Sequence, residues 1–286
     1  MRLYRDFTSQ EELDREYNPG AALPESAALI EGWAARSERA RATLPCETGL
    51  RFGPSLDEYL DLYPAGPGTP LHVFVHGGYW RRFTAREHGF VAPALVGAGV
   101  SVAVLNYALC PKVTIDEIVR QVRAALAWLH AHAGRYDCDP ARITLSGHSA
   151  GGHLTAMALL TDWPGDYGLP EDLVKGGLAI SGLFDLAPFP YTYLQPSLQL
   201  GWDQVRRNSP ILHLPPSAAP LDVAVGGAES VEFRRQSRDF HAAWQERGLD
   251  GDLLEVPDAN HFTVLEELER PQSPLLASLL ARARAR

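Results

Sequence analysis

Short apolar runs alternate with segments of helical periodicity from about residue 71 to the end of this 286-residue chain. Such runs are typical of buried strands, and the segments between them place apolar residues three and four positions apart. This alternation favours a mostly parallel sheet with helices on both faces, in a single α/β domain that spans residues 1–286. The predicted strands are 71–75, 101–107, 141–147, 176–182, 221–227 and 251–257.

Two segments interrupt the alternation, and we expect both to cover the functional site. Residues 8–45 are polar and alanine-rich, and Thr8 or Ser9 can cap a helix that starts there. Residues 183–216 are rich in proline and aromatic residues and are interpreted as a small cap-like insertion at the edge where open α/β sheets bind ligands. Two short strands are expected within 47–63. The remaining predicted helices are 86–98, 114–133, 150–160, 231–247 and 274–284.

The composition excludes several classes of partner. A formal net charge of −9 without a basic stripe argues against nucleic acid. No apolar run approaches the roughly 18 residues that span a membrane, and the N-terminus lacks the apolar segment of a secretory signal. Cys46, Cys110 and Cys138 are scattered and odd in number, as is typical of a reducing compartment. We expect a cytoplasmic protein that acts on a small molecule and forms either a monomer or a homodimer.

No cofactor or metal ion is expected. The chain has no H-E-x-x-H pattern, and His130 and His132 lie two positions apart on a predicted helix, so they do not share a face. The stretch Gly97-Ala98-Gly99 precedes a strand, whereas a dinucleotide-binding loop opens a helix. The chemistry is therefore expected to come from the protein's own side chains.

The stretch Gly147-His148-Ser149-Ala150-Gly151 matches G-x-S-x-G between a predicted strand and a predicted helix. In this context a serine projects from a sharp, strained turn, so that its Oγ is available as a nucleophile. Small flanking residues let neighbouring backbone come close. The helix that starts here points free N–H groups at developing negative charge. Ser149 is the candidate nucleophile; an ordinary glycine-rich turn with a capping serine is the alternative.

A second motif, His76-Gly77-Gly78, directly follows the predicted strand 71–75. In lipases and esterases, an N–H group from such a loop and the N–H of the residue after the nucleophile form an oxyanion hole. Here the donors would be Gly77, Gly78 and Ala150, with His76 organising the loop. Two motifs at the carboxyl ends of two strands predict a serine hydrolase.

The base is expected late in the chain, because the order in this kind of hydrolase is nucleophile, acid, histidine. His261 follows the last predicted strand, and His241 falls within a helix. For the acid, Glu229 follows the carboxyl end of the strand 221–227. Asp258 and then Asp222 are the alternatives.

With these residues, the chain resembles the α/β-hydrolase superfamily, and more narrowly the kynurenine formamidase (arylformamidase) and related bacterial esterase group. The most specific stretch is H-G-G-Y-W, in which Tyr-Trp replaces the third glycine of the usual H-G-G-G. The other matching stretches are LDREYN (13–18), LNYALCP (105–111), SGHSAGGHL (146–154), VGGAESVEFRRQS (225–237) and NHF (260–262). The resemblance covers nearly the whole chain and implies the α/β-hydrolase fold, with helices on both faces of the sheet.

The resemblance also implies roles for individual residues. Ser149 would be the nucleophile, His261 the base and Glu229 the acid, at a position where family members usually carry Asp.

Four further residues are expected near the substrate: Tyr17, Tyr79, Trp80 and His148. For the three aromatic residues, packing in the core is the alternative interpretation.

The function that the resemblance implies is hydrolysis of a small aryl formamide, such as N-formylkynurenine, to an aryl amine and formate, a step of tryptophan catabolism. A carboxylesterase for short acyl or aryl esters is the alternative enzyme. A non-catalytic binding protein is a third hypothesis, but such proteins typically lose the nucleophile or the histidine, and both are present here.

Overall fold

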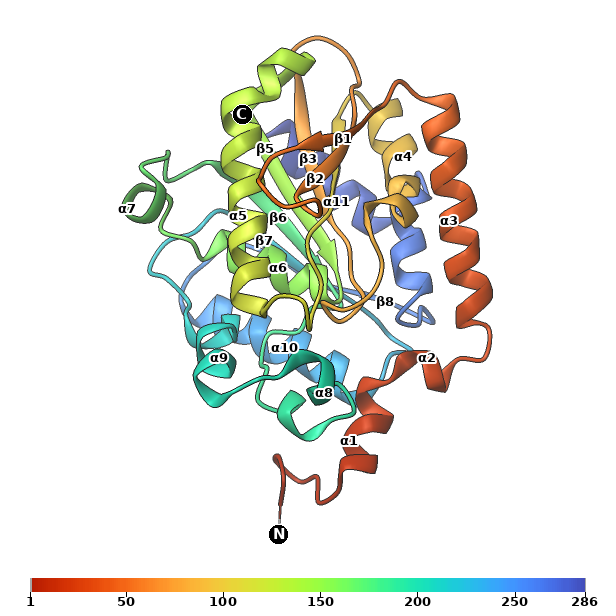
Figure 1. Cartoon of the computed structure of the whole chain (residues 1–286), viewed down its shortest axis with the longest axis vertical. Helices are drawn as coiled ribbons and strands as arrows, with labels where there is room; N and C mark the ends of the chain where they lie inside the picture. The colour runs from red at the N-terminus through yellow and green to blue at the C-terminus, as the bar shows by residue number, and fades with distance from the viewer. Residues whose placement is uncertain (1, 286) are drawn as a thin grey trace.

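The central sheet of eight strands lies between two layers of helices in the computed structural model, which describes residues 2–285 (Figure 1). The strand order is β1-β2-β4-β3-β5-β6-β7-β8, and only β1 and β2 run antiparallel to their neighbours. The strands are β1 (Glu47–Arg51), β2 (Tyr59–Tyr63), β3 (Thr69–Val75), β4 (Ser101–Leu105), β5 (Cys138–His148), β6 (Val174–Ile180), β7 (Leu221–Gly226) and β8 (Leu253–Val256). The prediction of a mostly parallel α/β sheet is confirmed.

Eleven α-helices are present in the described part of the chain. They are α1 (Gln10–Tyr17), α2 (Pro19–Ala22), α3 (Ser26–Thr43), α4 (Ala92–Gly97), α5 (Ile115–His132), α6 (Ala150–Leu159), α7 (Trp163–Tyr167), α8 (Gln195–Leu198), α9 (Trp202–Arg207), α10 (Val231–Glu246) and α11 (Pro274–Arg284). None of them is both long and apolar enough to cross a lipid bilayer.

The strand order reverses direction at β3. The chain goes from β3 to β4 on one side and then returns to β5 on the other side, and β3 pairs with both strands in parallel. Ligands of open α/β sheets bind beyond the carboxyl ends of the strands at such a reversal. The register pairs Val75 with Gly147, so the loops that follow β3 and β5 leave the sheet at the same level.

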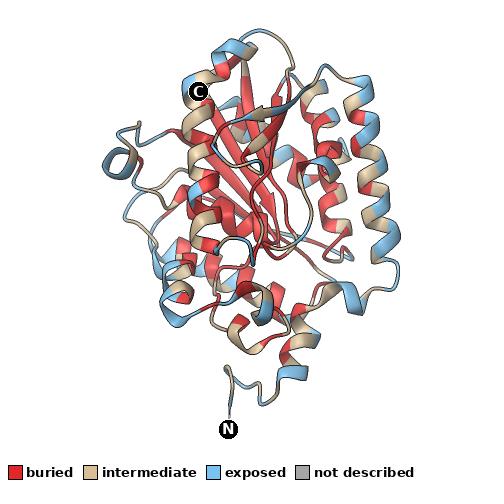
Figure 2. Cartoon of the chain, viewed as in Figure 1, coloured by how far each residue is buried: buried red, intermediate tan, exposed pale blue. Residues whose placement is uncertain are grey.

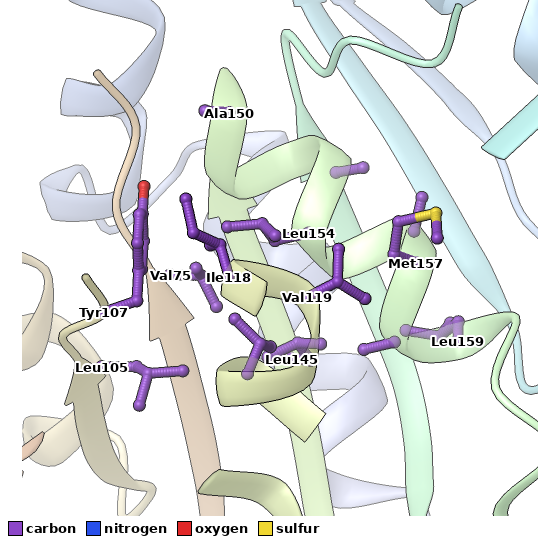
Figure 3. Close-up of a cluster of buried hydrophobic side chains, with 14 of the residues drawn as sticks. Val75, Leu105, Tyr107, Ile118, Val119, Leu145, Ala150, Leu154, Met157 and Leu159 are labelled. Atoms are coloured by element: carbon purple, nitrogen blue, oxygen red, sulfur yellow. The ribbon is translucent and has the colours of Figure 1, made fainter. Parts of the chain in front are cut away.

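The side chains of the parallel strands alternate between two buried layers, because successive residues of a strand point to opposite faces. Val73 and Val75 belong to the layer covered by α5, α6 and α10, whereas Phe74 belongs to the layer covered by α3, α4 and α11. Figure 2 shows the buried sheet between helices whose outer sides are exposed. In Figure 3, Val75, Leu105 and Leu145 of three strands lie with side chains of α5 and α6.

The N-terminal segment differs from the single helix that the sequence predicts. It forms three helices, α1 to α3, with breaks near Asn18 and near Pro24. Asn18 caps α2 through its side chain, and Pro19 occupies the first turn of α2. Proline restricts the residue before it to extended backbone, which ends a helix. The predicted helix 86–98 is likewise shorter, since two 3-10 turns, Ala85–Glu87 and Gly89–Val91, precede α4.

Candidate active site

Ser149 occupies the turn between β5 and α6 in a strained backbone conformation, with φ of 57° and ψ of −117°. A positive φ is rare for a residue with a side chain and persists only where the surroundings impose it. The side chain makes no capping hydrogen bond to α6, although Ser149 stands at the N-cap position. The Oγ is therefore not engaged with the helix backbone, which argues against the alternative of a structural capping serine.

The two glycines of the motif permit this turn by allowing close backbone contacts. A Cβ on Gly147 would lie 2.3 Å from the carbonyl oxygen of Gly151. A Cβ on Gly151 would lie 2.0 Å from the carbonyl oxygen of Val75. Because both distances are far below van der Waals contact, α6 can start against the end of β3 only when both positions are glycine.

His261 and Glu229 form a buried hydrogen-bonded pair. The Nδ1 of His261 lies 2.6 Å from the Oε2 of Glu229, and both side chains are nearly inaccessible to solvent. The carboxylate accepts a hydrogen bond from the Nδ1–H of His261. The Nε2 of His261 is therefore the nitrogen that can exchange a proton with a reactant. The other carboxylate oxygen, Oε1, accepts from the N–H of Gly226 at 2.8 Å and from the hydroxyl of Ser181 at 2.5 Å.

The two alternative acids lie in other surroundings. Asp222 is bonded to Arg282 at 2.7 Å and to Ser278, at the amino end of β7 and away from His261. Asp258 is exposed, with a positive φ of 59°. Of the three carboxylates considered from the sequence, the structure brings only that of Glu229 to His261.

His148 precedes the candidate nucleophile in the chain and contacts the candidate base. Its Nε2 lies 2.8 Å from the backbone carbonyl oxygen of His261, and the two rings are 4.7 Å apart between centroids. Burial, together with the neighbouring His261, holds the pKa of His148 well below its ordinary value, so the ring is neutral and Nε2–H donates. His148 thus fixes the backbone that carries the base, and it also contacts the cavity.

The predicted oxyanion donors lie at the ends of β3 and β5. The N–H groups of Gly77, Gly78 and Ala150 donate to no backbone carbonyl within the described residues. A Cβ on Gly77 would lie 3.1 Å from the Cβ of Ser149, so this loop passes directly beside the nucleophile. Gly78 has a φ of 102°, a conformation that glycine adopts without strain.

A cavity of about 260 Å³ opens onto these groups. Ser149, His148 and His261 form part of its wall together with Gly77 and Gly78. The predicted nucleophile and base therefore face the same enclosed space.

The rest of the wall comes from the two segments that interrupt the alternation. Helices α2 and α3 contribute residues from Pro19 to Trp33, and the insertion contributes Tyr193. Figure 1 shows α1, α2, α8 and α9 gathered at one end of the sheet.

Of the three aromatic residues expected near the substrate, only Tyr79 lines the cavity. Tyr17 is completely buried, and its hydroxyl is bonded to Glu232 of α10 at 2.7 Å. Trp80 is also completely buried, and its Nε1–H donates to His153 at 3.2 Å. Both side chains pack in the core, where their polar atoms find hydrogen-bond partners. This differs from the expectation of substrate contact.

No sequence motif predicts a role for Ser181. It follows β6 with a φ of 49°, is fully buried, and donates its hydroxyl hydrogen to Glu229. The only signal in the sequence is its place near the end of the predicted strand 176–182, which precedes the strand of the acid in the chain. Among residues 2–285, no group of three His, Cys, Asp or Glu side chains is arranged to hold a metal ion.

Comparisons with known proteins agree with this geometry. The chain is 33% identical to a kynurenine formamidase of Danio rerio, over 95% of both chains, and 34% identical to that of Salmo salar, over 94% of both. The chain belongs to the kynurenine formamidase family. The BD-FAE family profile matches residues 56–165, which contain both the stretch 76–78, the predicted oxyanion loop, and the turn at Ser149. An esterase of Mycobacterium tuberculosis, LipQ, is 28% identical over 70% of this chain and 52% of its own length.

Solved structures support the same fold. A protein of Silicibacter sp. TM1040, provisionally described as a thioesterase, is 33% identical with a TM-score of 0.81, over 93% of this chain and 98% of its own. An esterase of Pyrobaculum calidifontis shares the fold with a TM-score of 0.71 at 21% identity, over 96% and 98% of the two chains. This member of the kynurenine formamidase family is a serine hydrolase with the α/β-hydrolase fold.

Proposed function

We propose that this family member hydrolyses a small aryl formamide, with N-formylkynurenine as the first candidate, by acyl transfer through Ser149. The observation that carries the proposal is the Glu229–His261 pair, whose imidazole lines the same cavity as the strained Ser149. The relatives from Danio rerio and Salmo salar, which match nearly the whole chain, are kynurenine formamidases.

The first half of the reaction transfers the formyl group to the enzyme. His261 Nε2 takes the proton of Ser149 as its Oγ attacks the formyl carbon, and Glu229 stabilises the imidazolium that forms. The N–H groups of Gly77, Gly78 and Ala150 hold the developing oxyanion. The C–N bond then breaks, and the imidazolium gives its proton to the leaving aryl amine.

The second half releases formate. A water molecule takes the place of the amine, and His261 removes its proton while the oxygen attacks the formyl ester on Ser149. The same N–H groups stabilise the second oxyanion. Cleavage of the ester returns the proton to Ser149 and leaves formate, so nucleophile and base are restored.

A small acyl group fits the space beside the nucleophile. The oxyanion loop approaches Ser149 so closely that a methyl group on Gly77 would lie 2.7 Å from the carbonyl oxygen of His148. The cavity volume of about 260 Å³ lies just below the range of about 300–1,000 Å³ that is typical of ligand pockets, so the cavity suits a small substrate. The aromatic side chains of Trp33, Tyr79 and Phe262 give the wall an affinity for an aryl leaving group.

A carboxylesterase for short acyl esters is the second candidate, because esterases are also among the relatives and use the same chemistry. The test is the ratio of kcat/KM for N-formylkynurenine to kcat/KM for p-nitrophenyl acetate. Formamide turnover that equals or exceeds ester turnover supports the proposal. Ester turnover without formamide turnover would replace it with the second candidate.

The remaining expectations stay predictions. A small-molecule partner follows from the proposed reaction. A cytoplasmic location and the choice between monomer and homodimer are predictions from the sequence. A step in tryptophan catabolism would follow if N-formylkynurenine is the physiological substrate.

A further inference from the structure

The charged side chains on the wall of the active-site cavity are all of one sign. Arg81 and Arg82 line the cavity, and no Asp or Glu among residues 2–285 does so. The sign of this charge is opposite to the net charge of the whole chain, in which acidic residues exceed Lys and Arg by nine. A positively charged cleft in an acidic protein concentrates anions at that site.

The two arginines have no ionic partner among residues 2–285. No carboxylate of these residues lies within 4.0 Å of either guanidinium. The Nε of Arg81 is buried and has no hydrogen-bond partner. A buried donor without a partner costs stability, so a ligand that accepts from it would recover that free energy.

Aromatic rings hold both guanidinium groups near the cavity. The Cζ of Arg81 lies 5.5 Å from the ring centroid of Tyr193, and that of Arg82 lies 5.2 Å from the ring centroid of Phe83. Tyr193 and Phe83 also line the cavity. A guanidinium packed on a ring keeps its N–H groups directed outward, and its planar geometry suits a carboxylate.

The arginines are connected directly to the oxyanion loop. The backbone N–H groups of Arg81 and Arg82 both donate to the carbonyl oxygen of Gly78, at 3.1 and 3.0 Å. Gly78 is itself one of the residues that face the nucleophile. The two arginines and the predicted oxyanion donors Gly77 and Gly78 therefore belong to one short loop, and the loop backbone fixes the distance between them.

We propose that Arg81 and Arg82 form a subsite for a carboxylate on the leaving-group side of the substrate, which makes aryl substrates with an anionic tail the preferred class. The inference rests on the proposed function, because it assigns the leaving group to this cavity. The described cavity wall offers no carboxylate to an ammonium group. Recognition therefore depends on the anion, and an α-amino group on the tail adds no ion pair.

The test measures binding, which does not require turnover. The ligands are 4-(2-aminophenyl)-4-oxobutanoate and its primary amide, which differ by one negative charge and contain no scissile formamide. Isothermal titration calorimetry gives the ratio of their Kd values for the wild type, for Arg81→Gln/Arg82→Gln and for Arg82→Gln alone. Arg86→Gln is the matched control, since Arg86 is exposed on the same segment and does not line the cavity.

The wild type is expected to bind the carboxylate at least about tenfold more tightly than the amide, as is typical of a hydrogen bond to a charged group. The double variant should lose this preference, Arg82→Gln should lose part of it, and Arg86→Gln should keep it. Added salt should reduce the preference of the wild type. Melting temperatures show whether each variant is folded.

Equal Kd values in the wild type, or a preference that survives in the folded double variant, would overturn the subsite. So would a failure of both ligands to bind the wild type. A protein that binds the carboxylate selectively but does not hydrolyse N-formylkynurenine would instead refute the proposed formamidase function and leave the subsite standing. The two proposals thus fail by different measurements.

Discussion

The Nδ1 of His261 lies 2.6 Å from the Oε2 of Glu229, although 32 residues separate them in the chain. The carboxylate is held in turn by the N–H of Gly226 and the hydroxyl of Ser181. In serine hydrolases such a carboxylate orients the imidazole of the base and stabilises its protonated form.

Glu229→Gln should lower kcat by about 10³- to 10⁴-fold, because the amide cannot stabilise the imidazolium and favours the wrong tautomer. Steady-state kinetics with an aryl formamide measure the effect. Asp258→Asn is the control, since Asp258 is exposed and His261 is already paired with Glu229. Wild-type rates for Glu229→Gln together with a large loss for Asp258→Asn would assign the acid to Asp258.

Ser181→Ala should lower kcat by roughly tenfold with little change in KM, because one of the two donors to Glu229 Oε1 is lost while the cavity wall is intact. Stability should fall by about 1–2 kcal/mol, since a buried acceptor loses a partner. An unchanged kcat in folded Ser181→Ala would mean that the hydroxyl does not position the acid.

Gly77→Ala should lower kcat by at least about 10²-fold, the typical effect of removing an oxyanion donor. The added methyl group would lie 2.7 Å from the carbonyl oxygen of His148 and 3.1 Å from the Cβ of Ser149, so the loop must move. Gly97→Ala is the matched control, because nothing lies within 4 Å of its added methyl group in α4. That variant should keep full activity and gain about 0.5–1 kcal/mol of stability.

Stability should fall as the pH is lowered from about 6.5, because five histidines are buried in their neutral form. Burial lowers the pKa of His72 and His76 to about 3 and that of His88 and His153 to about 4, and it also lowers that of His148. In the unfolded chain the histidine pKa values are near 6.5. At any pH between the folded-state and the unfolded-state pKa values, the unfolded chain therefore binds more protons than the folded chain. For each additional proton that the unfolded chain binds, the free energy of unfolding falls by about 1.4 kcal/mol per pH unit as the pH is lowered.

Calorimetric unfolding at pH 5.5 in two buffers of different ionisation enthalpy measures this proton uptake. About four protons should be taken up per molecule. Uptake of fewer than two would show that these histidines are already protonated in the folded state or accessible to water.

Much of the fold follows from local patterns. The buried strands β3 to β7 appear as apolar runs, and the turn at Ser149 requires glycines that the sequence displays. His261 follows from chain order alone. These features are predictable because each depends on neighbouring residues or on the order of elements.

Other features depend on contacts that no local pattern encodes. Ser181 reaches Glu229 only because β6 and β7 are adjacent, with Ile180 paired to Ala224. Tyr17 and Trp80 were expected at the substrate because aromatic residues suit both a pocket and a core. The orientation of each side chain depends on a hydrogen-bond partner far away in the sequence, Glu232 for Tyr17 and His153 for Trp80.

Labelling with a fluorophosphonate probe, followed by mapping of the modified peptide by mass spectrometry, tests directly whether Ser149 is a nucleophile activated by His261. Stoichiometric modification of Ser149 is expected in the wild type. Modification should be at least about 10³-fold slower in folded His261→Ala, since the general base is absent. Labelling at another residue, or equal rates in the wild type and His261→Ala, would contradict the account.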